Sequence, residues 1–416
     1  MRKQAFGDSQ VSVIGLGSGY FGGKTAESQA REFMDAYAAM GGNLIDTARV
    51  YGDFVTPRSG ESEKVIGRWL TDRRCRKDIF LSTKGGHPSL HDMHRSRLSR
   101  EEIRGDMAES LHDLQTDYVD IFWLHRDDES RPVGGIMETL QSLIEDGSAR
   151  MIGVSNWRPE RIEEANRYAV SHGLTPLTAN QPQFSLARQV RCYDPTLTAM
   201  DEKTWRMHRQ TGMICCCFSS QAGGFFTKLE ASGWEKLPEN LKNDYGCEEN
   251  LHILERPRVL RGEIGLSVGS LALAYLTCQP FPTFALVGAS RIEHVLALKE
   301  AGDAVLSPGS GTGFACLKRD GPRPYSFMIR VLTPGVVIVV DLPGNARRQT
   351  NADVAAGIIG MKLLQTFSRV ESDTVVPNTD TKRRAVRESG HLASKVQPGK
   401  RETIRKSGDK SSLVRS

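Results

Sequence analysis

An alternation of short apolar runs with amphipathic segments fills about the first 300 residues of this 416-residue chain, and it limits the possible folds more than any other feature. The apolar runs do not carry a polar residue at every second position, so they are typical of strands that are buried on both faces. We predict eight such strands, over residues 11–16, 43–48, 79–84, 119–125, 149–156, 177–184, 213–220 and 284–290. Helices must then cover one side of the sheet that these strands form.

The segments between the apolar runs have their apolar residues at helical spacing. The predicted helices cover residues 26–40, 61–70, 99–114, 133–145, 158–172, 198–211, 267–276 and 292–300. One of them opens with Ser99 and Glu102, which have the spacing of a capping box. Eight repeats of strand and helix in about 290 residues match a (β/α)8 barrel in length and in order.

A doubly wound open sheet is the alternative arrangement of alternating strands and helices. Its first strand is usually followed by a glycine fingerprint that opens a helix. Residues 15–20 (GLGSGY) match this fingerprint only in part, and no helical pattern begins there. We therefore predict an α/β fold, a (β/α)8 TIM barrel over residues 1–303 with a short N-terminal segment, whose active site lies at the carboxyl ends of the strands.

The chain after residue 303 differs from the barrel region in composition. Residues 308–313 (PGSGTG) are typical of a linker, and they precede a strand-like run over 336–340 and a helical pattern over 354–367. From residue 318 to the end, 19 Lys and Arg outnumber 9 Asp and Glu, although the net charge of the whole chain is only +5. We predict that residues 304–416 form a largely disordered, basic C-terminal extension.

Two basic clusters of this extension, 382–384 and 400–406, leave open a contact with nucleic acid or with an anionic membrane surface. No aromatic residues are interleaved with the clusters, so we prefer a solvated extension and expect neither nucleic acid nor membrane as a partner. The sequence does not define an oligomeric state.

The chain shows no leading charged-then-apolar segment and no apolar run near the ~18 residues needed to cross a bilayer. Its eight cysteines include three consecutive ones, Cys215, Cys216 and Cys217, in an apolar run. None of the cysteines has the paired spacing of a zinc site. We predict a cytoplasmic protein with buried free thiols and no bound metal.

Four polar residues lie at, or just after, the ends of predicted strands, where a barrel has its active-site mouth. Asp46 and Tyr51 follow the second strand, Lys84 ends the third, and His125 ends the fourth. A phenol with an unperturbed pKa near ~10 is a weak acid at neutral pH, but a neighbouring ammonium stabilises its phenolate. A carboxylate can hold that ammonium, and an imidazole can orient a carbonyl oxygen and share in the proton transfer. The four residues together predict a proton donor for a carbonyl group.

Three segments of the chain resemble the signatures of the aldo-keto reductase family. Residues 43–70 (NLIDTARVYGDFVTPRSGESEKVIGRWL) are similar to its D-T-A-x-x-Y-G and E-x-x-x-G pattern. Residues 110–127 (SLHDLQTDYVDIFWLHRD) resemble its D-Y-V-D strand that leads to a histidine, and residues 147–156 (GSARMIGVSN) resemble its G-V-S-N segment. The likeness extends over about residues 5–302 and includes all four polar residues in the same order.

The resemblance implies an NADP-dependent oxidoreductase that transfers a hydride between the cofactor and an aldehyde or ketone, or the corresponding alcohol. Tyr51 would be the general acid in reduction and the base in oxidation, with Lys84 and Asp46 tuning it and His125 positioning the carbonyl. A cofactor-sensing regulatory subunit of the same fold, with little turnover, is the alternative.

The resemblance also implies a cofactor that lies extended across the barrel mouth. Ser155, Asn156 and Gln181 would hydrogen-bond the nicotinamide carboxamide. Phe218 occupies the position on which the nicotinamide ring stacks, and Ser219 the position near the pyrophosphate. The family usually continues with proline and leucine after that serine, whereas this chain continues with Ser-Gln.

Residues 286–296 (LVGASRIEHVL) resemble the segment that binds the adenosine phosphate. Ser290 would lie at a helix N-terminus, where free amides and the helix dipole attract a phosphate. Arg291 can add a charge-assisted contact to a 2′-phosphate, so we expect NADP(H) rather than NAD(H). Ala297 and Leu298 depart from the family, which usually has Glu and Asn there.

Two aromatic residues are candidates for the substrate pocket. Trp157 directly follows the Ser-Asn pair, and Tyr20 lies in the loop after the first strand. Packing beneath the loops is the alternative role for both. Aromatic walls would suit a carbonyl substrate with a flat, apolar body.

Overall fold

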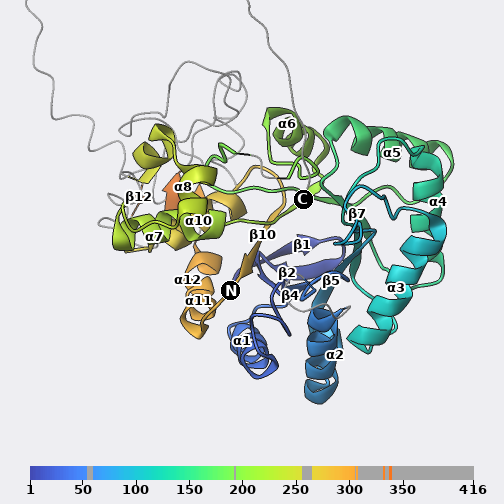
Figure 1. Ribbon diagram of the computed structural model, residues 1–416, viewed down its shortest axis with the longest axis horizontal. Coiled ribbons are helices and arrows are strands. Elements are labelled where there is room, and N and C mark those ends of the chain that lie inside the picture. Colours follow the sequence, from blue (N-terminus) through green and yellow to red (C-terminus); the bar gives the residue numbers. More distant parts are fainter. Residues whose placement is uncertain are drawn as a thin grey trace, which may run out of the picture. The chain divides into compact units, whose positions relative to one another are not determined.

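The computed structural model describes residues 1–53, 60–191, 194–254 and 265–304, and three short strands beyond them. Eight parallel strands form a closed barrel, in which the last strand pairs with the first (Figure 1). These strands are β3 (Ile14–Gly17), β4 (Leu44–Asp46), β5 (Phe80–Gly85), β6 (Ile121–Leu124), β7 (Ile152–Ser155), β8 (Ala179–Gln181), β9 (Ile214–Cys217) and β10 (Thr283–Gly288). The prediction of a (β/α)8 barrel is confirmed.

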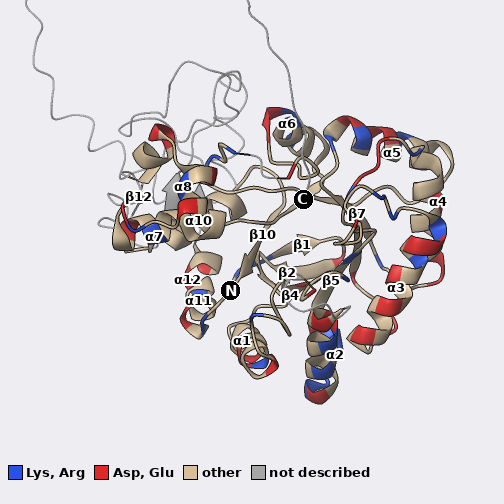
Figure 2. Cartoon of the chain, viewed as in Figure 1, with Lys and Arg blue, Asp and Glu red and all other residues tan. Residues whose placement is uncertain are grey.

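Helices surround the barrel and follow the strands in the chain (Figure 1). They are α1 (Glu27–Ala39), α2 (Glu61–Arg73), α3 (Arg100–Leu114), α4 (Val133–Glu145), α5 (Pro159–Ser171), α6 (Glu202–Thr211), α10 (Val268–Thr277), α11 (Ile292–Leu296) and α12 (Leu298–Asp303). The predicted capping box is present, because the Ser99 side chain accepts from the Glu102 amide and Glu102 accepts from the Ser99 amide. Charged residues concentrate on these helices, as Figure 2 shows.

The predicted strand over residues 11–16 is in fact divided between two strands. Its first part belongs to β2 (Ser9–Ser12), which pairs antiparallel with β1 (Lys3–Phe6), and its second part is β3 of the barrel. The ring of Phe6 lies 4.7 Å from that of Phe80 and 4.9 Å from that of Phe284. The hairpin thus adds Phe6 and Val11 to the interior cluster of the barrel, so apolar residues of β2 precede those of β3 in the sequence.

Other boundaries also differ from the expected ones. The helix expected over 198–211 begins only at Glu202, because the side chain of Asp201 caps it by accepting from the Thr204 amide. The pattern over 292–300 forms the two short helices α11 and α12. The long segment after β9 contains two further helices that the apolar pattern did not reveal, α7 (Phe225–Ser232) and α8 (Glu239–Tyr245).

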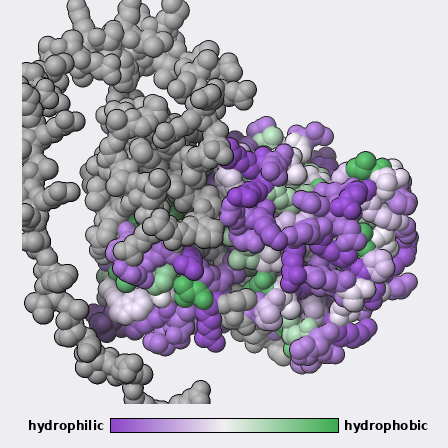
Figure 3. Space-filling view, turned by 90° about the horizontal axis from the view of Figure 1, so that it is seen from above, coloured by the Kyte–Doolittle hydropathy of each residue, from purple (hydrophilic) through white to green (hydrophobic). Residues whose placement is uncertain are grey.

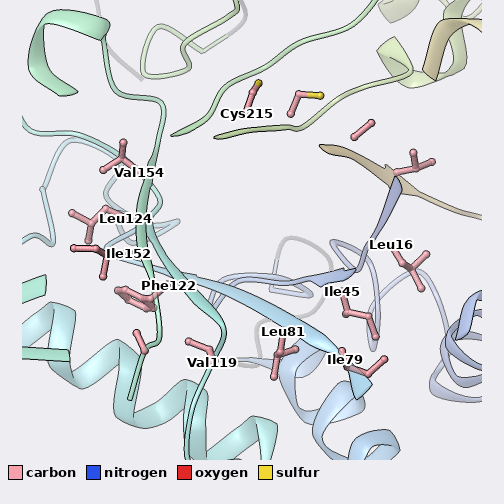
Figure 4. Close-up of a cluster of buried hydrophobic side chains, with 14 of the residues drawn as sticks. Leu16, Ile45, Ile79, Leu81, Val119, Phe122, Leu124, Ile152, Val154 and Cys215 are labelled. Atoms are coloured by element: carbon pink, nitrogen blue, oxygen red, sulfur yellow. The ribbon is translucent and has the colours of Figure 1, made fainter. Parts of the chain in front are cut away.

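Side chains along each barrel strand alternate between two hydrophobic clusters, because successive residues of a strand point to opposite faces. On β5, Phe80 belongs to the interior cluster and Leu81 to the outer one, which packs the strands against the helices. Figure 4 shows part of the outer cluster, including Ile45, Leu81 and Phe122. The two cysteines Cys215 and Cys217 face outward and Cys216 faces inward, all three as free, buried thiols, as predicted.

His208 of α6 is a fully buried histidine of the outer layer that we expect to make stability depend on pH. It hydrogen-bonds the Met213 carbonyl through Nδ1 (2.9 Å) and Asn180 through Nε2 (3.3 Å). Burial lowers the pKa of His208 to about 4, whereas an unfolded histidine has a pKa of about 6.5. As the pH falls from about 6.5 to 4, only the unfolded state takes up this proton, so the free energy of unfolding decreases, by up to about 3 kcal/mol.

Denaturant unfolding of wild type and His208→Asn at pH 7 and pH 5 measures this contribution. Asparagine can keep one hydrogen bond but does not titrate, so the variant should lose less stability between the two pH values than wild type does. His112→Gln, at a side chain that is 87% exposed, is the control and should behave as wild type. An unchanged pH dependence in His208→Asn would contradict the prediction.

Beyond residue 304 the structure describes only three short strands, β11 (Leu306–Ser307), β12 (Val331–Leu332) and β13 (Val337–Val339), paired in the order β11-β13-β12. The strand expected over 336–340 therefore corresponds to β13. The helix expected over 354–367 and the expected disorder of the extension lie outside the described residues.

The described surface is largely hydrophilic on the face seen in Figure 3, with isolated apolar residues. Among the described helices, none combines the length and the apolar character that a membrane span requires.

Candidate active site

Strand alternation brings the predicted catalytic side chains together at the carboxyl end of the barrel. On β5, Phe80, Ser82 and Lys84 lie two residues apart, so Lys84 points into the barrel above the interior cluster. Asp46 ends β4, next to β5, and His125 follows the last residue of β6 on the other side of β5. Three neighbouring strands thus supply three of the four groups.

The Lys84 ammonium is the centre of the site. Its Nζ donates to Asp46 Oδ2 (2.5 Å), to the Thr47 carbonyl (2.8 Å) and to the Tyr51 hydroxyl (3.1 Å). Burial would lower the pKa of Lys84, but the negative charge of Asp46 and the contact with Tyr51 outweigh this effect and raise it. A permanent positive charge therefore lies beside the phenol oxygen.

The Asp46 carboxylate is held by partners other than Lys84. Its Oδ1 accepts from Ser82 Oγ (2.7 Å) and from Gln181 Nε2 (3.1 Å). Ser82 in turn accepts from the indole of Trp123 (2.7 Å). Both oxygens of this buried carboxyl group therefore have hydrogen-bond partners.

His125 contacts Tyr51 through its ring, with the ring centroids 5.8 Å apart in an edge-to-face arrangement. The imidazole is 7% exposed, and its Nδ1 has no hydrogen-bond partner among the described residues. Burial holds the pKa of His125 well below its usual value, and the nearby Lys84 ammonium adds to this effect. The imidazole is therefore neutral at physiological pH.

Arg49, which the sequence analysis missed, fixes the loop that carries Tyr51. Its amide donates to the Lys84 carbonyl (3.0 Å), and its guanidinium binds Glu63 (3.3 Å) and Asp113 (3.0 Å) on two helices. The guanidinium passes so close to Gly60 that a Cβ atom there would lie 1.7 Å from it. Glu63 is fully buried, and burial raises its pKa to about 7 although Thr83 and Arg49 stabilise its charge.

The three residues expected at the nicotinamide carboxamide lie together at the ends of β7 and β8, and the structure gives each of them a protein partner. Ser155 Oγ donates to the Gln181 carbonyl (2.7 Å). Asn156 Nδ2 donates to the His125 carbonyl (3.1 Å), and Asn156 Oδ1 accepts from the Thr198 amide (3.1 Å). Gln181 donates to Asp46. The side chains are thereby held in fixed positions beside the four catalytic candidates.

The residues expected at the ring and phosphates of a cofactor lie after the two adjacent strands β9 and β10. Phe218 is partly buried, and Ser219 is exposed with a positive φ of 52°. Ser290 and Arg291 are exposed, and both contact His294, at 3.3 and 3.0 Å. Ser290 directly precedes Arg291, the N-cap of α11, and so lies at the N-terminal end of this helix.

The two aromatic candidates for the substrate pocket have different environments. Tyr20 is 51% exposed, with the Lys24 ammonium 4.9 Å from its ring centroid. Trp157 is fully buried, donates to the Arg126 carbonyl (3.2 Å) and belongs to the outer hydrophobic cluster. Of the two roles considered for Trp157, this burial favours packing beneath the loops.

His87 is a second histidine at the site that the sequence analysis did not identify. It follows β5 after Gly85 and Gly86, and its ring lies 4.7 Å from that of His125. The pairing depends on two loops that meet in space, and the position of one residue in the sequence does not reveal it. Over the described residues, no group of three or more metal-binding side chains converges.

A family model described as the aldo/keto reductase family matches residues 13–310. A putative aryl-alcohol dehydrogenase of Saccharomyces cerevisiae is 30% identical over 315 residues, which cover 72% of this chain and 78% of that protein. Norsolorinic acid reductase B of Dothistroma septosporum is 27% identical over 343 residues, which cover 78% of this chain and 83% of that protein.

Among solved structures, an aldo/keto reductase from Klebsiella pneumoniae in complex with NADP and acetate has a TM-score of 0.55 to this chain at 24% sequence identity. The match covers 74% of this chain and 92% of that one. At this sequence identity, the similarity is evidence for the fold alone.

Proposed function

The chain belongs to the aldo/keto reductase family, whose members are oxidoreductases, and from this premise we propose that it transfers a hydride between NADP(H) and an aldehyde or ketone, or the corresponding alcohol. Tyr51 is the proton donor in reduction and the acceptor in oxidation. The observation that carries this proposal is the pair of contacts from the buried Lys84 ammonium, to the Tyr51 hydroxyl at 3.1 Å and to Asp46 at 2.5 Å.

The proton transfer follows from the charges around Tyr51. When its proton leaves, the phenolate lies beside the positive charge of Lys84, which stabilises it in a buried environment. Asp46 keeps the ammonium in place and compensates its charge when Tyr51 is neutral. The tyrosine can therefore give up a proton and take it back without any large movement of the chain.

His125 orients the carbonyl oxygen. Its Nδ1 is buried without a partner among the described residues, and an unpaired acceptor costs less there than an unpaired N–H donor. The proton of the neutral imidazole therefore belongs on Nε2, which donates to the substrate oxygen. This hydrogen bond and the acidic hydroxyl of Tyr51 would act on the same oxygen.

The exposed residues after β9 and β10 fit a phosphorylated dinucleotide. Phe218 offers a partly buried aromatic face, Ser219 and Ser290 offer hydroxyls, and Arg291 offers a guanidinium that suits a 2′-phosphate. NADP is also present in the complex of the Klebsiella pneumoniae neighbour. When bound, the cofactor would supply the hydride, while the protein orients the groups that react.

We propose aryl aldehydes and aryl alcohols as the first substrate class to test. A relative with 30% identity is named as an aryl-alcohol dehydrogenase, and Tyr20 supplies an exposed aromatic ring in the loop after β3. Loss of NADPH absorbance on adding benzaldehyde to the purified protein would support this activity. Tight NADPH binding without turnover over a broad set of carbonyl compounds would favour the cofactor-sensing alternative instead.

Arg291→Ala should weaken the preference for NADPH. Removing one charge-assisted hydrogen bond to a phosphate costs about 1.5–3 kcal/mol, so the KM for NADPH should rise by roughly 10- to 100-fold while that for NADH changes little. Steady-state kinetics with both cofactors measure the effect. Arg209→Ala, at an exposed position of α6, is the control. An equal change for both cofactors would show that Arg291 does not contact the 2′-phosphate.

A further inference from the structure

We propose that His87 is a positioning residue for His125, and that its ring holds the His125 imidazole in the orientation in which it meets the substrate carbonyl. The role of His125 in this statement rests on the proposed function. The contact between the two rings and the support behind His87 do not depend on it.

The two imidazoles are packed edge to face, with centroids 4.7 Å apart and planes at 64°. Both are buried, His87 at 5% and His125 at 7% exposure. The ring centroids of Tyr51 and His125 are 5.8 Å apart, and these rings also pack edge to face. The His125 ring therefore lies between a catalytic phenol and a second imidazole.

His125 needs such packing because no hydrogen bond from the described residues fixes its ring. The structure gives its Nδ1 no partner among the described residues, and the ring torsion of a histidine is otherwise broad. An imidazole that must direct one N–H at a carbonyl oxygen has to be held within a small range of angles. Contacts with the rings of Tyr51 and His87 must therefore restrict the orientation of the His125 imidazole.

His87 can provide this support because its own position is fixed. Its Nδ1 lies 2.7 Å from the Pro88 carbonyl, which defines the orientation of the ring. The Gly86 amide donates to Asp106 Oδ2 (2.8 Å), and Arg97 joins Asp106 (2.6 Å) to the His87 carbonyl (3.3 Å). The left-handed backbone of Gly86 (φ 72°) makes the turn that brings the imidazole to His125.

The environment of His87 keeps its ring neutral at physiological pH. Burial, then the nearby Arg126, lowers the pKa of His87 to about 4, although Asp194 opposes the shift and Arg97 adds to it. Lys84 and Arg126 are nearby charged groups that further lower the pKa of His125. Two neutral rings therefore meet at physiological pH, and protonation of His87 would place a positive charge against His125.

Two substitutions of His87 test the proposal. His87→Ala removes the ring, and we expect kcat for NADPH-dependent reduction of benzaldehyde to fall by about 10- to 100-fold, because the carbonyl is no longer oriented. The smaller side chain should also admit water to the site. Because this reduces the effect of burial, the pKa of His125 should rise by about one unit or more. His87→Phe keeps an aromatic ring and should restore most of both properties.

The measurements are kcat and KM for benzaldehyde over pH 5 to 8, and the titration of His125 in the NMR spectrum of histidine-labelled protein. His94→Ala, at an exposed position of the same loop, is the control and should match wild type. Arg97→Met keeps both imidazole rings but removes the hydrogen bonds from Arg97 to Asp106 and to the His87 carbonyl. It should therefore lower kcat as well, by a smaller factor than His87→Ala. Circular dichroism verifies that each variant is folded.

The proposal is overturned if His87→Ala leaves both kcat and the His125 titration unchanged, or if folded His87→Phe is as impaired as His87→Ala. Should wild type reduce no carbonyl compound, the proposed function fails, and the NMR titration still decides whether His87 controls the environment of His125. The two failures are therefore distinguishable.

Discussion

Tyr51→Phe is expected to lower kcat for carbonyl reduction by roughly 10²- to 10⁴-fold, the usual contribution of a positioned general acid. The substitution removes one oxygen atom, which accepts a hydrogen bond from Lys84 at 3.1 Å, and keeps the ring that packs against His125. Binding of NADPH should not change, because the hydroxyl contacts no residue expected at the cofactor. Single-turnover rates and NADPH titration by tryptophan fluorescence separate the two effects.

Tyr118→Phe is the matched control, since it removes the same atom from a ring that precedes β6, at the opposite end of the strand from the site, and that packs between Arg76 and Arg150. Its kcat should stay close to that of wild type. If Tyr51→Phe consumes NADPH at the wild-type rate, another group donates the proton, and the proposed mechanism is wrong.

Strand periodicity explains why so much of the fold and of the catalytic group was predictable. Buried strands are recognised as apolar runs. A polar residue that ends such a run must be hydrogen-bonded or ion-paired, or must have a function. Lys84 and Asp46 end two apolar runs that form adjacent strands. Because a closed barrel places the carboxyl ends of its parallel strands at one end, the two side chains come together there. Their contact at 2.5 Å agrees with this expectation.

Features that depend on how loops meet were not predictable in the same way. His87 and Arg49 lie in loops, and their partners are far away in the sequence, so no periodicity identifies them. Trp157 follows a strand as a pocket residue would, yet its ring is buried in the outer hydrophobic cluster, which its position in the sequence does not reveal. The hairpin strand β2 was merged with β3, since both bury apolar side chains and only Val13 separates the two strands in the sequence.

The second large effect is expected for Lys84→Met, in which the ammonium is replaced by an apolar chain of similar length. Asp46 is 2% exposed and would keep only Ser82 and Gln181 as partners for a buried negative charge. Breaking a buried ion pair in this way costs about 3–5 kcal/mol of unfolding free energy. Turnover should fall as well, because no positive charge then stabilises the Tyr51 phenolate. Denaturant unfolding and NADPH consumption measure the two losses.

Lys203→Met provides the control for the stability effect. Lys203 pairs with Glu160 at 2.8 Å, but both side chains are more than half exposed, at 74% and 62%. Solvent screens such a pair, so its removal should change the free energy of unfolding little. A similar loss in both variants would mean that the Lys84–Asp46 pair contributes no more than an ordinary surface contact.

The double variant Lys84→Met/Asp46→Asn separates the structural role of the pair from its chemical role. Asparagine removes the unpaired charge and can still hydrogen-bond Ser82, so the double variant should recover much of the stability that Lys84→Met loses. It should recover no turnover, because the charge beside Tyr51 is still absent. If activity returned together with stability, the ammonium would be needed only to keep the strands in place, and some other group would have to stabilise the Tyr51 phenolate.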